Sequence, residues 1–225
     1  MNAIAVRKIE EDRFELKNIS RQIKNTLKES GTVTITENLN LDGLASGLRY
    51  GKVYIKGSVG DYVGLLNSGA KLIIDGDAGN YLGDNMTSGE IIVKGNSAFC
   101  TAPYCYGGTV VIFGNCGDFL GTMNKGATIF VEKNVGNDIG TYMLAGNIIL
   151  LGNARKRVGN FFIRGRIFIR GKWESLGHNT KIEDLTSEDR DFLQQFLSSH
   201  KIKVRVEEFT KLVPETDKPF YSKES

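Results

Sequence analysis

The sequence predicts an all-β protein, a right-handed parallel β-helix of about seven turns. Two observations lead to this prediction. Glycines recur at a fixed spacing of 19 residues between positions 57 and 171, and each interval contains a short apolar run rich in Ile and Val. A fixed spacing of this length is typical of a solenoid, in which each repeat forms one turn and only stacked neighbours bury a core.

The glycines form columns when the repeats are aligned on the pattern GxxGxxxG. Glycine permits positive φ and a close approach of two backbones, so we expect these residues to shape the corners of the solenoid and to bind no ligand. The pattern is interrupted at Ala98, Ala102 and Lys133, which predicts a bulge in the middle turn. The predicted structural corners are Gly57, Gly60, Gly64, Gly76, Gly79, Gly83, Gly114, Gly117, Gly121, Gly136 and Gly140.

The apolar runs predict one strand for each turn. Short runs rich in β-branched residues and bounded by glycine favour strands over helices, and copies that stack in register must pair in parallel. Alternation along a strand places two columns, beginning at Val53 and Ile55, toward one face as the core. A third inward column begins at Val63 and closes the opposite wall. The runs cover residues 52–56, 71–75, 90–94, 109–113, 128–132, 147–151 and 166–170.

A further column of large apolar residues lies between the two core columns and is expected to point outward. A soluble monomer rarely exposes an apolar patch of several hundred Å². We therefore expect the patch to be covered, either by the terminal segments of the chain or by another subunit or a second copy. This outer column, the candidate interface, consists of Tyr54, Ile73, Ile92, Val111, Phe130, Ile149 and Phe168.

The two ends of the chain have different patterns. Residues 1–31 are predicted as a helical cap on the open end of the sheet, because Ile19, Ile23 and Leu27 recur at four-residue steps and Gly31 follows as a stop signal. Residues 32–172 are predicted as the β-helix. Residues 173–225 are predicted as a helix followed by an extended tail that packs on the solenoid or on a partner.

The C-terminal helix has its own start signal and apolar face. Thr186 followed by Asp189 resembles a capping box, and an apolar face follows it. The last turn of the solenoid is basic and is expected either to face the acidic segment 183–191 or to dock an acidic partner. The apolar face consists of Phe192, Leu193, Phe196 and Leu197, and the basic residues are Arg155, Lys156, Arg157, Arg164, Arg166, Arg170 and Lys172.

The side chains that could perform chemistry do not form a known set. The spacings of Cys100, Cys105 and Cys116 match no common zinc pattern, and the only two histidines lie far along the chain, so buried thiols are expected. Many β-helix proteins cut polysaccharides, and Asp118 with Asp138, or Asp61 with Asp84, would be the acid/base pair of such an enzyme. Asp beside Gly is more often a turn former. We predict no catalytic, cofactor-binding or metal-binding residue.

Composition narrows the classes of partner. The net charge of +3 is modest, which gives no case for nucleic acid or an anionic membrane. No apolar segment approaches the roughly 18 residues of a membrane span, and residues 1–13 lack the order of a secretory signal. The protein is therefore expected to be cytoplasmic.

The repeats GSVGDYVGLLNSG, GDAGNYLGDNMTSGEIIVKG and GNCGDFLGTMNKG, together with the tail FTKLVPETDKPFY, resemble the glycine-repeat (GXGXG) domain at the C-terminus of the glutamate synthase large subunit. The likeness covers residues 32–220 and is strongest to the free-standing archaeal-type subunit. The glycine-repeat subunit of formylmethanofuran dehydrogenase is similar in the repeats.

The resemblance implies a non-catalytic subunit of a multi-subunit oxidoreductase. In glutamate synthase such a domain packs between the glutaminase and flavin synthase parts, so FMN and iron-sulfur clusters are expected in partner subunits and no cofactor in this chain. Two alternatives remain open: a subunit of a tungsten or molybdenum formylmethanofuran dehydrogenase, and a stand-alone β-helix enzyme acting on carbohydrate. A homo-oligomer through the outer column is a further expectation.

Overall fold

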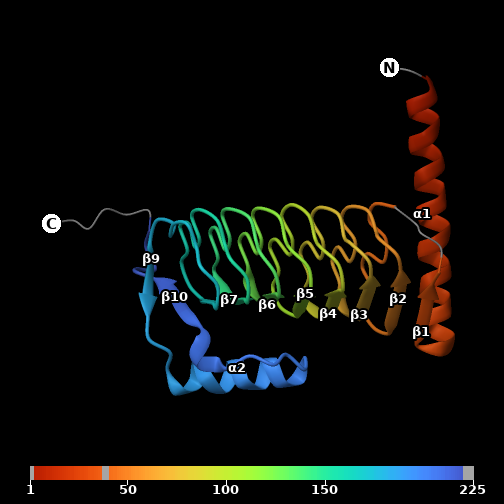
Figure 1. Ribbon diagram of the computed structural model, residues 1–225. Helices are drawn as coiled ribbons and strands as arrows, with labels where there is room; N and C mark the ends of the chain where they lie inside the picture. Colours follow the sequence, from red (N-terminus) through yellow and green to blue (C-terminus); the bar gives the residue numbers. More distant parts are fainter. Residues whose placement is uncertain (1–2, 37–40, 220–225) are drawn as a thin grey trace.

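The computed structural model describes residues 3–36 and 41–219, with side chains from residue 15 onward. It shows a parallel β-solenoid of about seven turns, with one helix across its first end and a second beneath its sheet (Figure 1). The predicted fold class is confirmed. Residues 1–2 of the predicted cap and residues 220–225 of the predicted tail lie outside the described residues.

The solenoid carries one sheet in which consecutive strands are neighbours, in the order β1 to β8. All of these pairs are parallel. Val53 lies beside Leu72 and Leu72 beside Ile91, as the 19-residue repeat requires, whereas β1 and β2 pair at a separation of 20 residues, as in Val33 beside Val53. The strands are β1 (Thr32–Ile35), β2 (Lys52–Lys56), β3 (Ser68–Asp75), β4 (Ser88–Val93), β5 (Thr109–Ile112), β6 (Lys125–Val131), β7 (Ala145–Leu150) and β8 (Arg166–Ile169).

The C-terminal segment changes the strand direction. β10 (Thr210–Pro214) pairs antiparallel with β8, and β9 (Thr180–Glu183) pairs antiparallel with β10 at the edge of the sheet. Between these two strands lie α2 (Ser187–Ser199) and the short helix η1 (Val206–Glu208). Isolated parallel bridges join Trp173 and Leu176 to the turn before, so the coil continues for part of a turn beyond residue 172.

The core fills the inside of the solenoid. The two inward columns of the strands, represented by Val53 and Ile55, are buried, and so is the third column that begins at Val63. The positions are repeated from turn to turn, with the buried Thr101 as a polar member of the third column, so an apolar core runs along the axis. This agrees with the expected core columns.

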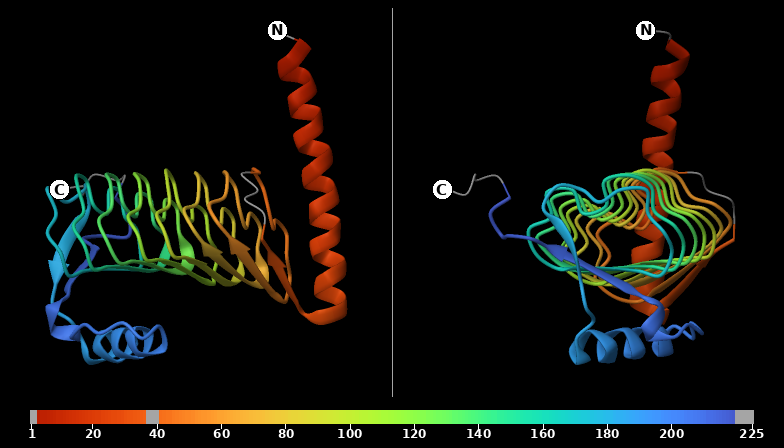
Figure 2. Two further views of the ribbon diagram at one scale, coloured as in Figure 1. Left: turned by 45° about the vertical axis from the view of Figure 1, so that its right-hand side comes forward. Right: turned by 60° about the vertical axis from the view of Figure 1, so that its left-hand side comes forward.

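Helix α1 (Ala3–Ser30) lies across the first end of the solenoid (Figure 2). Ile23 and Leu27 are buried in the core cluster, and Ile19 packs against it. The helix therefore covers apolar side chains that the first turn would otherwise expose. Among the described residues, neither helix contains a stretch long and apolar enough to cross a membrane.

The corner glycines serve two different purposes. Gly64 has φ +70°, a conformation that other residues adopt at a cost. Gly79 does not have positive φ; a Cβ there would lie 2.7 Å from the carbonyl carbon and oxygen of Gly60 in the preceding turn. Glycine is required at Gly79 because the turns stack closely. The backbone at this corner does not need positive φ.

We expect Gly79→Val to lower the free energy of unfolding by about 1 to 3 kcal/mol, because the added side chain must push two turns apart. Thermal unfolding followed by circular dichroism measures the change. A melting temperature equal to that of the wild-type protein would contradict the close-packing role.

Polar side chains form a ladder along one edge. Each side-chain oxygen accepts a hydrogen bond from the backbone N–H of the residue 19 positions later. Asp77 Oδ1 accepts from the N–H of Asn96 at 2.7 Å, and Asn96 Oδ1 accepts from the N–H of Asn115 at 2.9 Å. The ladder satisfies backbone donors where the chain leaves the sheet, which explains the column of Asp and Asn. Its accepting members are Ser58, Asp77, Asn96, Asn115, Asn134 and Asn153.

Two buried asparagines mark the start of β3 and β6. Asn67 donates to the carbonyl of Ala70 at 2.8 Å and accepts from its N–H at 3.0 Å, and Asn124 makes the same pair of bonds to Ala127. The strand register shifts at both places. The shift leaves one N–H and one C=O without a ladder partner, and the asparagine side chain satisfies both.

Candidate functional site

The three cysteines are buried, unpaired thiols. Burial raises the pKa of Cys100 to about 11, and that of Cys105 and of Cys116 to about 12. The thiolate is the nucleophile and the metal ligand, so these thiols are poor in both roles at neutral pH. Within the described residues, no group of three or more His, Cys, Asp or Glu side chains is arranged to hold a metal ion.

We expect no rapid reaction of the native protein with a thiol-specific disulfide reagent at pH 8, because Cys100, Cys105 and Cys116 are protonated and shielded there. The same reagent should modify all three cysteines in denaturant. Absorbance at the released thiolate band counts the reacting groups. One fast-reacting cysteine in the native protein would contradict this account.

The aspartates considered as an acid/base pair have structural partners. Asp118 Oδ1 accepts from the backbone N–H of Asn137 at 2.7 Å, in a second column of side chains that bond to the backbone 19 residues later. Asp138 is buried and forms an ion pair with Arg157, whose Nε lies 2.8 Å from Oδ1. Asp61 accepts in the same way from Asn80. These carboxylates are used in building the solenoid.

Asp84, the fourth aspartate considered for acid/base chemistry, is partly buried. Burial raises the pKa of Asp84, and this effect exceeds the lowering by its hydrogen bonds to Asn85. Asn85 Nδ2 lies 2.7 Å from Asp84 Oδ1. The bond is local, and it does not bring Asp84 together with Asp61 as a pair.

The outer column is divided into two parts. Helix α2 lies under the sheet in both views of Figure 2 and covers the column from β5 to β8. Leu193, Phe196 and Leu197 are buried against this part, and the ring centroids of Phe130 and Phe196 are 5.7 Å apart. The four column residues with no exposed surface are Val111, Phe130, Ile149 and Phe168. The chain's own C-terminal segment therefore occupies this half of the candidate interface.

The other part of the outer column is not fully covered. Tyr54 on β2 is 38% exposed, and Ile73 on β3 and Ile92 on β4 are partly exposed. Ile92 packs against the edge of the α2 cluster. Only these three residues of the candidate interface remain accessible to a partner.

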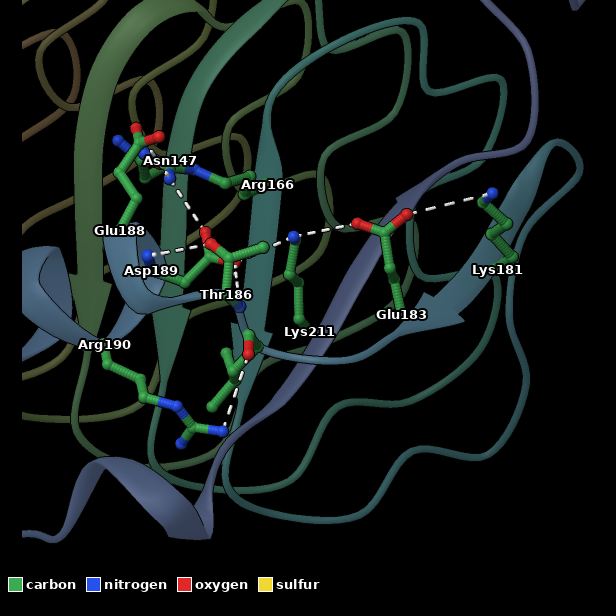
Figure 3. A network of polar contacts seen from close by, with 10 residues as sticks. Asn147, Arg166, Lys181, Glu183, Thr186, Glu188, Asp189, Arg190 and Lys211 are labelled. Carbon is green, nitrogen blue, oxygen red and sulfur yellow. Dashed lines mark hydrogen bonds and ion pairs between the residues drawn. The ribbon is translucent and has the colours of Figure 1, made fainter.

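A buried ionic network anchors the first turn of α2 (Figure 3). Asp189 accepts from Arg166 of β8 and from Lys211 of β10, each at 2.8 Å, and its side chain is 1% exposed. Thr186 and Asp189 also form the capping box expected from the sequence. Lys211 has a second carboxylate partner in Glu183 of β9, at 2.8 Å. The network thus joins the helix to three strands.

Charge pairing sets the ionisation of this network. Burial alone would raise the pKa of Asp189, but hydrogen bonds from Lys211, Thr186 and Arg166 more than offset it and hold this pKa below its ordinary value. Burial alone would lower the pKa of Lys211. The hydrogen bonds to Asp189 and Glu183, and the charges of these two carboxylates, more than offset burial and raise this pKa. Both groups are therefore charged at neutral pH.

We expect the protein to lose stability as the pH falls below about 4. The folded-state pKa of Asp189 lies below the unfolded value of about 3.9, so its contribution is complete above that value and disappears as the pH falls through the folded-state pKa. Urea unfolding at pH 7 and at pH 3 measures the change. Equal free energies of unfolding at both pH values would contradict it.

The far end of α2 has a smaller anchor. His200 Nε2 lies 3.2 Å from Glu90 Oε1 on β4, and Glu90 is also paired with Lys71 on β3 at 2.5 Å. The ring of His200 stacks on Phe196. This contact fixes the end of α2 at the boundary between the two parts of the outer column.

The basic last turn is largely neutralised within the chain. Arg166 and Arg170 pair with Asp189 and Glu208 of the C-terminal segment. Arg155, Arg157 and Arg164 pair with Glu174, Asp138 and Asp217. The expected contact with the acidic segment is therefore present through Asp189, which leaves less positive charge for an outside partner.

Together these observations define a class of protein: a parallel β-solenoid whose N-terminal and C-terminal helices pack on it. The family follows from comparison with known proteins. The family model described as the GXGXG motif matches residues 2–218, so the chain belongs to the GXGXG family. None of the curated proteins matches the chain.

Proposed function

We propose that this chain is a non-catalytic structural and interaction subunit of a multi-subunit oxidoreductase, and that the enzyme is glutamate synthase. In this role it holds a glutaminase polypeptide and a flavin synthase polypeptide together while glutamine and 2-oxoglutarate are converted to glutamate. FMN and iron-sulfur clusters then belong to the partner subunits.

The observation that carries the proposal is the contrast between the chain's reactive groups and its surface. The thiols are buried and protonated, and Asp61, Asp118 and Asp138 are engaged in ladders or an ion pair. Apolar side chains at Tyr54, Ile73 and Ile92 nevertheless remain accessible on the sheet. A surface with an uncovered apolar part suits a protein that binds other proteins. Membership in the GXGXG family and the resemblance of the tail support the choice of glutamate synthase.

The test is affinity purification of the tagged chain from its native cell, followed by mass spectrometry of the proteins that accompany it. An untagged strain is the control. A flavin synthase polypeptide together with a glutaminase polypeptide is the expected result. Recovery with pterin-metal dehydrogenase subunits would assign the chain to formylmethanofuran chemistry instead. Recovery of the chain alone, with activity on carbohydrate, would overturn the scaffold role.

A further inference from the structure

The accessible part of the outer column continues the surface that α2 already covers. Tyr54, Ile73 and Ile92 lie on β2, β3 and β4, in the same column as the four residues buried under α2. The strands keep one register across the boundary, so the backbone of the sheet repeats from the covered part to the accessible part. We call the part over β2–β4 the open face.

The covered part shows what kind of element fits this surface. Helix α2 has 13 residues and presents an apolar face to the column, with Leu193 and Leu197 one helical turn apart. It ends where His200 meets Glu90 of β4, so it stops at the edge of the open face. A second helix placed end to end with α2 would meet the same spacing of apolar side chains.

The size of the open face limits the length of such a helix. Strands β2 to β4 span about 10 to 14 Å at the usual strand spacing of about 4.8 Å. A helix rises about 1.5 Å per residue, so about 6 to 10 residues fit along the axis. The fitting helix is therefore shorter than α2, which has 13 residues.

Charge around the open face favours an acidic occupant. Among the residues that the structure describes, four outward lysines lie there against two carboxylates: Lys52, Lys56, Lys71 and Lys94 against Asp75 and Glu90. Both carboxylates are already paired, Asp75 with Lys94 at 3.1 Å and Glu90 with Lys71. Lys52 and Lys56 flank Tyr54 and form no ion pair with any residue that the structure describes. A second copy of the chain would bring the same excess of lysines against itself, which is unfavourable in a self-complementary interface.

We propose that the open face binds an amphipathic helix of a partner polypeptide, with acidic side chains on both sides of an apolar stripe, placed end to end with α2. The inference rests on the proposed scaffold role for the existence of a partner. The surface itself is defined by Tyr54, Ile73, Lys52 and Lys56.

The test is a fluorescence anisotropy titration of the full chain with a labelled 14-residue peptide, which is long enough to cover the whole face. The peptide carries Leu at helical spacing and Glu at the flanking positions, and the control peptide has Lys in place of Glu. We expect the acidic peptide to bind at least about tenfold more tightly than the control, with an affinity that falls as salt is added.

Variants of the chain locate the binding site. Ile73→Glu and the double variant Lys52→Glu/Lys56→Glu should each weaken binding of the acidic peptide by at least about tenfold. Ile182→Glu is the matched control, because Ile182 is an exposed apolar residue on β9 at the other edge of the sheet. Lys52 and Lys56 are exposed, so the double variant should keep the wild-type melting temperature even if Ile73→Glu does not.

Three results would overturn the inference: equal binding of the acidic and the lysine peptide, equal loss of binding in Ile182→Glu, or a wild-type dimer in sedimentation velocity that Ile73→Glu converts to a monomer.

The purification experiment separates this inference from the scaffold role. If the Lys52→Glu/Lys56→Glu chain still recovers both partner polypeptides, the docking face is wrong and the scaffold role is retained. If the wild-type chain recovers neither, the scaffold role is wrong.

Discussion

Replacing Asp189 by Ala is expected to lower the free energy of unfolding by about 3 to 5 kcal/mol and to loosen α2 from the sheet. The carboxylate is buried and holds two cations, Arg166 and Lys211, at 2.8 Å each. Without it, Lys211 keeps only Glu183, which is about half exposed. A buried charge that loses its main partner is far more costly than an exposed ion pair.

Urea unfolding measures this loss, and binding of a hydrophobic dye reports exposure of the outer column when α2 leaves. Glu188→Ala is the matched control, because Glu188 is the neighbouring carboxylate on the same helix, its side chain is 86% exposed, and it lies 3.7 Å from Arg166. The control should cost less than about 1 kcal/mol. If the two substitutions have equal effects, the network does not anchor α2 in the way described.

The sheet could be predicted from the sequence because its period fixes its geometry. Once the repeat is known to be 19 residues, parallel pairing places Val53 beside Leu72, and alternation decides which side chains point inward. The start of α2 could be predicted as well, since the capping box of Thr186 and Asp189 is a local signal.

The sequence predicted that the outer column is covered but could not decide between the terminal segments and another subunit, because this depends on contacts between segments far apart in the chain. Phe130 contacts Phe196, but neither the sequence around Phe130 nor the sequence around Phe196 indicates this contact. Lys211 lies in a segment that resembles an extended, solvated tail, yet its side chain is buried between two carboxylates. Lysine is rarely buried, and only the folded arrangement shows its partners.

The backbone of the GxxGxxxG segments could not be predicted from the sequence either. Tyr62, Tyr81 and Phe119 adopt positive φ, a conformation that large side chains rarely take. The rings of Tyr62 and Tyr81 are stacked with their centroids 4.8 Å apart, and Phe99 joins Tyr81 to Phe119 through an edge contact and a tilted contact. Stacking between successive turns offsets part of the conformational cost, and this arises only when the turns are assembled.

One further signal of corner geometry is present in the sequence, and its meaning becomes clear only from the structure. The column that contains Asn67 and Asn124 is otherwise apolar. Where this column has Asn, the residue three positions later is Ala; where it has an apolar residue, the residue three positions later is Gly. The glycines in that second column have positive φ, for example +91° at Gly89, whereas Ala70 and Ala127 do not. Other pairs of the apolar kind are Leu48 with Gly51, Met86 with Gly89, Cys105 with Gly108, Met143 with Gly146 and Phe162 with Gly165.

The two combinations are alternative solutions for the same corner. Glycine turns through the left-handed region, and an apolar side chain then fills the core beside it. Alanine avoids that region, and the chain takes a path on which the N–H and C=O of Ala127 need the side chain of Asn124, at 2.9 Å for each bond.

Asn124→Met is therefore expected to lower the free energy of unfolding by about 2 to 4 kcal/mol, because two buried backbone groups of Ala127 lose their partner. Ala127→Gly alone should cost about 1 kcal/mol or less. The double variant Asn124→Met/Ala127→Gly reproduces the combination found at Met86 with Gly89 and should recover most of the loss, with a coupling energy of about 1 to 3 kcal/mol.

A double-mutant cycle by urea unfolding measures this coupling. If the double variant is as unstable as the sum of the single variants, the corner does not have two interchangeable solutions, and the alternation along the column has another cause. If the coupling appears, each turn of the solenoid can be assigned one of two corner types from two residues alone. The same cycle at Asn67 and Ala70 should then give a similar coupling energy, since Asn67 makes the same two bonds to Ala70 and is equally buried.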